Sequence, residues 1–164
     1  MSIDPSTLNA SMREELLEFL GAYFDGTDHA FGGESVEFPD CTVTLDRPQF
    51  DKTLSKPSIF LDTLEPRSLD RKASAAGMRQ RFDIPMRIAV YTSDSKKSWK
   101  VNDQIQDCIG VVFNGAPAEL GAEGIKTRAV GGPVKIHLDA SQEWQVSYRT
   151  VTFRVALEYK RAGE

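Results

Sequence analysis

The chain of 164 residues has few cysteines and no long apolar run. Cys41 and Cys108 are not spaced as a CxxC pair and both fall inside apolar patterns, so we expect buried free thiols and neither a disulfide nor a zinc site. No apolar run approaches the roughly 20 residues that span a bilayer. The N-terminus lacks the basic and then apolar layout of a cleaved export signal. We therefore expect a soluble protein of the cytoplasm with no membrane partner.

Motifs that carry chemistry are missing as well. The sequence has no GxSxG, no phosphate-binding loop, no HExxH and only two histidines, His29 and His137. The acids near His29 do not have the spacing of a calcium loop. A net charge of −4 disfavours a dedicated nucleic-acid binder, which needs a basic surface. The sequence thus predicts that the protein is not an enzyme and has no catalytic residue, cofactor or metal.

The chain does have strong hydrophobic patterning, which is clearest in its last stretch, 144–161. Its length and its 40% of hydrophobic residues are enough for one domain, 1–164, with its own core. In 144–161 every second residue is apolar, as in a long strand. The apolar residues are even-numbered up to Tyr148 and odd-numbered from Val151 onward. This change predicts that the buried face switches between the two, at a β-bulge or a change of partner strand.

Two stretches repeat apolar residues at helical spacing. The first is 8–24, where Ser11 followed by Glu14 fits a capping box. The second is 99–113, an amphipathic pattern interrupted by Gly110. Because glycine in a helix costs about 1 kcal/mol, Gly110 indicates close packing against a neighbour or an early end to the helix. We expect both helices to cover a sheet.

Three shorter stretches alternate as strands do, at 41–45, 58–64 and 82–92. Pro85 has no backbone N–H to donate, so the first half of the third strand is predicted to lie at a sheet edge.

Segments 124–130 and 134–138 flank Gly131 and Gly132, which predicts a hairpin with a two-residue turn. Together these elements predict an α+β fold. Its sheet is mixed, mainly antiparallel and of about five to seven strands, with two α-helices packed on one face.

Two segments without apolar periodicity are predicted to be mobile loops, at about 25–40 and 65–81. The first contains five acids and no Lys or Arg, and the second has three more basic than acidic residues. Segment 65–81 is interpreted either as a flexible surface hairpin or as an arm that orders only against an anion, nucleic acid or another subunit. Its candidate subunit-contact or partner-contact residues are Arg67, Arg71, Lys72, Arg79 and Arg81.

The order of these elements, with the chain length and acidic balance, resembles the tail terminator, or tail completion, proteins of long-tailed bacteriophages. These are minor tail proteins. The pieces that carry the likeness are MREELLEFLGAYF, PSIFLDTLEP, RFDIPMRIAVYT, QIQDCIGVVFN and EWQVSYRTVTFRVALEYK. The likeness as a whole extends over most of the chain, and none of these pieces is a diagnostic motif.

The resemblance implies a structural function. Proteins of this family form a ring, generally a hexamer, that caps the tail tube, stops its polymerisation and presents a surface for head–tail joining. The implied partners are other copies of the chain, the major tail tube protein and the head–tail connector protein. Genome DNA would pass through the lumen without sequence-specific binding. The expected location is the head-proximal end of the virion tail, after assembly in the host cytoplasm.

Two alternatives remain open from the sequence. A head-completion or connector protein would share the non-enzymatic profile but would bind the portal in place of the tube. A small ligand-binding or regulatory domain would be monomeric or dimeric with a defined apolar pocket.

Overall fold

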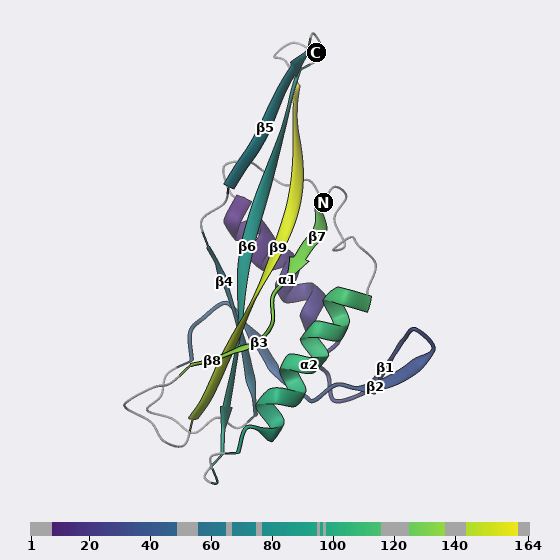
Figure 1. The fold of residues 1–164 in the computed structure, drawn as a ribbon, viewed down its shortest axis with the longest axis vertical. Coiled ribbons are helices and arrows are strands. Elements are labelled where there is room, and N and C mark those ends of the chain that lie inside the picture. Colours follow the sequence, from purple (N-terminus) through teal and green to yellow (C-terminus); the bar gives the residue numbers. More distant parts are fainter. Residues whose placement is uncertain are drawn as a thin grey trace.

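In the residues that the structure describes, the fold combines two helices with a seven-stranded sheet and a separate two-stranded hairpin (Figure 1). It is seen in a computed structural model. The residues described are 8–48, 56–64, 67–74, 77–94, 96, 98–115, 125–136 and 144–160.

The helices are α1 (Leu8–Gly21) and α2 (Lys100–Gly115), and the separate hairpin consists of β1 (Asp28–Phe31) and β2 (Glu34–Glu37). The strands of the large sheet are β3 (Thr42–Thr44), β4 (Ser58–Thr63), β5 (Arg67–Ser74), β6 (Gly77–Ser93), β7 (Ile125–Val130), β8 (Val134–Ile136) and β9 (Trp144–Lys160).

Two long antiparallel strands, β6 and β9, form the centre of the sheet. Their register is unbroken from Gly77 opposite Lys160 to Ser93 opposite Trp144. On the edge of β6 away from β9, β4 and then β5 pair with successive parts of the strand. Strand β3 pairs with β4 in parallel. Strands β7 and β8 pair with the other side of β9. The predicted α+β class, with a mixed and mainly antiparallel sheet, is confirmed.

The main core lies between the two helices and one face of the sheet. On β6 the even-numbered Ile84, Met86 and Ile88 are fully buried there. Opposite them α1 buries Met12, Leu16 and Leu20, and α2 buries Ile105, Ile109 and Val112. Burial of each such side chain contributes about 1.5–3 kcal/mol to the free energy of folding relative to an exposed one. This layer therefore supplies most of the favourable free energy of folding.

The edge position predicted from Pro85 is wrong, because β6 is a central strand. The carbonyl of Pro85 accepts a hydrogen bond from the Leu64 N–H at 2.9 Å. The backbone nitrogen and carbonyl of Pro85 therefore face β4 and β5. There it falls between the last pair of β4, Thr63 with Met86, and the pair of Arg67 with Asp83 in β5. The missing N–H therefore lies where one partner strand ends and the next begins.

The hairpin predicted around Gly131 and Gly132 is also wrong. Strands β7 and β8 do not pair with each other; both pair with β9, at residues 151–155 and 146–148. The Gly131 N–H donates to the Thr150 carbonyl at 2.9 Å, and a Cβ on Gly131 would lie 3.1 Å from that oxygen. Gly131 thus lets the chain run close along β9, where a turn had been expected.

The predicted switch of the buried apolar face of β9 between Tyr148 and Val151 is confirmed, and it coincides with a change of partner strand, because β8 pairs with residues 146–148 and β7 with residues 151–155. The register of β9 with β6 has no shift. Val151 and Phe153 lie in the helix-covered core, whereas Val146 and Tyr148 belong to a second apolar cluster. The apolar parity changes because the two clusters lie on opposite faces of one regular strand.

Segments 25–40 and 65–81, predicted to be loops, contain paired strands. The first holds β1 and β2, joined at Gly32 and Gly33, whose φ angles of 58° and 84° suit a tight hairpin turn. The second holds β5 and the start of β6. In addition, Ser11 lies inside α1, so the predicted capping box does not begin the helix.

Candidate functional site

The most extended feature of the molecule is a three-stranded arm, defined as β5 together with residues 77–83 of β6 and 156–160 of β9. It extends past the helices at one end of the fold (Figure 1). Within the described chain, β5 pairs only with β6, and the outer edge of β9 has no strand partner beyond Val155, which faces Ile125. Among the described strands, the arm therefore has two backbone edges without a partner, and such edges are ready templates for pairing with another chain.

All five predicted contact residues lie in this arm. The register pairs Lys72 with Arg79, Asp70 with Arg81 and Arg67 with Asp83. Residues paired across antiparallel strands occupy the same face of a sheet. The β6 members of these three pairs are at every second position, so they share one face as well. The fold thus brings the positions of Arg67, Lys72, Arg79 and Arg81 onto one face.

The fifth predicted residue, Arg71, is opposite Gln80 and so occupies the other face of the arm. The structure does not bring it together with the other four basic positions.

An ion cluster joins the base of the arm to the body. Arg154 Nε of β9 donates to Asp83 Oδ1 at 3.1 Å, and Arg128 Nε of β7 lies 3.6 Å from Asp83 Oδ2. The Asp83 side chain is only 12% exposed, so its charge is partly shielded from water. This cluster ties three strands together and could not be anticipated from the sequence, because its three members lie far apart along the chain.

The sheet face opposite the helices carries the second apolar cluster, here called the helix-free patch. Ala89, Tyr91 and Val146 are buried in it. The remaining members, which are partly exposed, are Phe60, Ile136, Trp144 and Tyr148. No residue of either helix belongs to this cluster. The even-numbered apolar residues of β9 were recognised in the sequence, but the patch as a whole was missed because its members on β4 and β6 alternate with core residues of the same strands.

Arg87 lies at the border of this patch. Its guanidinium carbon is 4.5 Å from the centroid of the Tyr148 ring, in a cation–π contact. Its Nε atom is buried and has no hydrogen-bond partner. Asp62 is opposite Arg87 in the register with β4, but no ion pair joins the two described side chains. The arrangement leaves a partly buried cation with an unused donor.

The β1–β2 hairpin projects from the helix-covered side of the fold (Figure 1). Asp28, Glu34 and Glu37 are exposed on it. His29 fixes its base, with its ring centroid 5.3 Å from that of Tyr23.

Asp25, just before this hairpin, holds the base from the other side. Hydrogen bonds from the Thr27 hydroxyl, from His29 and from the Thr27 N–H lower the pKa of Asp25 to about 2. The acidic segment is therefore an anchored hairpin that presents carboxylates to solvent.

A buried polar network joins α2 to the lower half of β9. Asn102 Nδ2 donates to the carbonyls of Val90 at 3.1 Å and Gln145 at 3.0 Å, and Gln106 Nε2 donates to Ser147 Oγ at 2.9 Å. The sequence contained a signal for this network. Asn102 and Gln106 are polar residues at i and i+4 on the helix, and Gln145 and Ser147 are polar residues at every second position of the strand.

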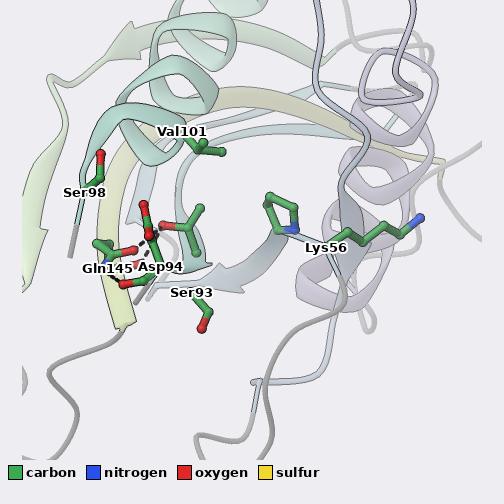
Figure 2. A pocket seen from close by; sticks show the side chains of 8 residues that line it. Lys56, Ser93, Asp94, Ser98, Val101 and Gln145 are labelled. Atoms are coloured by element: carbon green, nitrogen blue, oxygen red, sulfur yellow. Dashed lines mark hydrogen bonds between the residues drawn. The ribbon is translucent and has the colours of Figure 1, made fainter. Parts of the chain in front are cut away.

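At the end of this network lies a pocket of about 330 Å³ (Figure 2). It is lined by Lys56, Pro57, Thr92, Ser93, Asp94, Ser98, Val101 and Gln145. The Thr92 hydroxyl donates to Gln145 Oε1 at 3.3 Å, and Gln145 Nε2 donates to the Asp94 carbonyl at 3.4 Å. These polar groups of the pocket wall therefore bond to one another.

Among the described residues, no three His, Cys, Asp or Glu side chains come together closely enough to hold a metal ion. In the same part of the chain, neither helix has the length and apolar character needed to cross a membrane. His137 lies outside the described residues. No family model matches the chain, and no curated protein matches its sequence.

Proposed function

We propose that this chain is a tail terminator protein: a structural virion protein that forms a ring on the tail tube of a long-tailed bacteriophage, stops tube growth and joins the tail to the head. The observation that carries the proposal is the arm with its two open edges. A subunit that offers different edges on its two sides can bind a neighbour at each one, and such a head-to-tail contact closes into a ring when the rotation permits.

Strand addition at these edges would supply backbone hydrogen bonds that do not depend on side-chain identity. The basic positions on the arm and the acids on the β1–β2 hairpin would then select the partner and its register, as opposite charges do at other interfaces. Every subunit of such a ring points the same way, so its two faces differ. One face would bind the major tail tube protein and the other the head–tail connector.

The net charge of −4 agrees with a lumen through which genome DNA passes without sequence-specific binding. The sequence resemblance supports the same function, because a ring on the tail tube is what the resembled family forms.

The first test is the mass of the purified protein in solution, alone and with the tail tube protein. A ring of six copies would have six times the subunit mass of 18.2 kDa. A protein that stays monomeric under both conditions would contradict the proposal. A ring that binds the portal and not the tube would favour a head-completion protein.

The second test is tail length in phage that carry Arg71→Glu and Lys72→Glu. We expect folded protein but abnormally long tails that fail to join heads, because charges on an edge strand contribute little to stability but much to recognition. Lys100→Glu, on the exposed start of α2, is the control and should give normal tails. Normal tails after complete loss of the protein would overturn the proposed function.

A further inference from the structure

We propose that the helix-free patch, at Arg87 and Tyr148, receives the acidic β1–β2 hairpin of a second copy of this chain. This inference rests on the proposed function, because it assigns a contact of the proposed ring. It concerns a surface separate from the arm edges.

The receiving side has a cation that lacks an acceptor. Arg87 Nε is buried without a hydrogen-bond partner, and the guanidinium lies over the Tyr148 ring. The Arg87 side chain as a whole is partly exposed, so its charge can attract a carboxylate of a partner. A carboxylate is the best match, because its two oxygens fit the fork of a guanidinium.

The surroundings of Arg87 suit a protein contact more than a free anion. The partly exposed Tyr148 ring lies against the guanidinium of Arg87, and Asp62 of β4 is opposite Arg87 in the register. The helix-free patch continues along β9 to the partly exposed Trp144. Arginine, tyrosine and tryptophan in a dry setting are the residues that most often dominate binding energy at protein interfaces. The occupant should therefore bring a carboxylate for Arg87 and enough protein surface to cover the apolar residues of the patch.

The β1–β2 hairpin meets both requirements. Asp28, Glu34 and Glu37 are exposed on it, and segment 25–40 contains no Lys or Arg. Its four paired residues on each strand and its anchored base make it rigid, so little entropy is lost when it docks.

The two surfaces cannot meet within one chain. Phe31 and Val36 of the hairpin pack against the main core on the helix-covered face, whereas the patch lies on the opposite face of the same sheet. The contact must therefore join two copies. It is also head-to-tail, since each copy offers its hairpin to one neighbour and its patch to the other.

Charge reversal with mixing tests this contact directly. One variant carries Glu34→Lys and Glu37→Lys on the hairpin, and the other carries Arg87→Glu on the patch. Each variant alone places like charges at every contact, so its assembly should weaken by roughly tenfold or more. An equimolar mixture should recover assembly, because the lysine hairpin fits the glutamate patch and the native hairpin fits the native patch. Mass photometry over a range of concentrations measures this.

Two controls separate the contact from general charge and folding effects. Glu14→Lys with Glu18→Lys makes the same charge change on exposed positions of α1 and should assemble like the native chain. Arg87→Lys keeps the charge but loses the fork, and should weaken assembly without unfolding the subunit.

If native protein forms rings and the lysine hairpin variant assembles as well as the native chain, this inference is overturned while the proposed function stands. Failure of the mixture to assemble, with both variants folded, also overturns it. Native protein that never forms a ring overturns the proposed function itself.

Discussion

Gly110 of α2 lies so close to Arg149 of β9 that a Cβ on the glycine would be 3.1 Å from Nη1 of the guanidinium. The guanidinium is itself fixed: Nη1 donates to the Gly131 carbonyl and Nη2 to the Gln106 carbonyl, both at 3.0 Å. Burial lowers the pKa of Arg149, and the charge of Asp107 opposes this only in part. One arginine thus links α2, β9 and the β7–β8 connection, and it needs the glycine to do so.

Gly110→Ala should destabilise the fold. Alanine favours the helix by about 1 kcal/mol, but the clash with a guanidinium held by three hydrogen bonds should cost about 1–3 kcal/mol. Gly21→Ala is the matched control, because it also lies in a helix and a Cβ there meets nothing within 4 Å. Urea unfolding of both variants gives the comparison. Equal stability of the two would mean that Arg149 moves aside freely.

Phe153→Ala should remove about 3–5 kcal/mol from the free energy of unfolding. Phe153 is fully buried in the main core, with its ring centroid 5.7 Å from that of Phe113 in α2. Val134→Ala is the control on the same sheet, because Val134 is 47% exposed, and its change should stay within about 0.5 kcal/mol. Similar losses for both variants would contradict the placement of Phe153 in the core.

Asp25 should make the anchoring of the β1–β2 hairpin sensitive to acid. Its pKa is about 2 in the fold and about 3.9 when unfolded, so the folded state favours the charged form. The stabilisation is therefore complete above about pH 4 and is lost as the pH falls toward 2.

Backbone amide shifts of Thr27 and His29, followed from pH 5 to 2, should show this transition in the native chain. Asp25→Asn should abolish it, while Asp28→Asn, on the same hairpin, should leave it in place. An unchanged transition in Asp25→Asn would assign the effect to another group.

Both thiols should be unreactive until the protein unfolds. The prediction of buried free cysteines is confirmed, and burial raises the pKa of Cys41 to about 12 and that of Cys108 to about 11. Since the thiolate is the reactive form, a thiol reagent at neutral pH should modify neither residue in the native state and both in urea. Ser35→Cys, at an exposed position of β2, should react at once and serves as the positive control. Fast modification of Cys41 or Cys108 in the native protein would contradict their burial.

The sequence by itself determined the elements whose own residues have a strong period. Helix α2 follows from Ile105, Ile109 and Val112, and the long strands follow from their alternation, because burial of apolar surface is the dominant favourable contribution to folding. Gly110 was also interpretable alone, since a costly glycine inside a helix indicates a close neighbour. Its neighbour, Arg149, was not, because nothing local pairs two residues so far apart.

Tertiary structure decided everything that depends on which strands lie side by side. The change of apolar parity in β9 left a β-bulge and a change of partner strand open, and the structure has the change of partner, with an apolar cluster on each face of a regular strand. Pro85 is tolerated in a central strand only because β4 ends and β5 begins beside it. The arm and the acidic hairpin are strands through backbone pairing, which does not depend on the polarity of their side chains. The candidate contact surfaces therefore depend on the pairing of strands, which no single stretch of sequence contains.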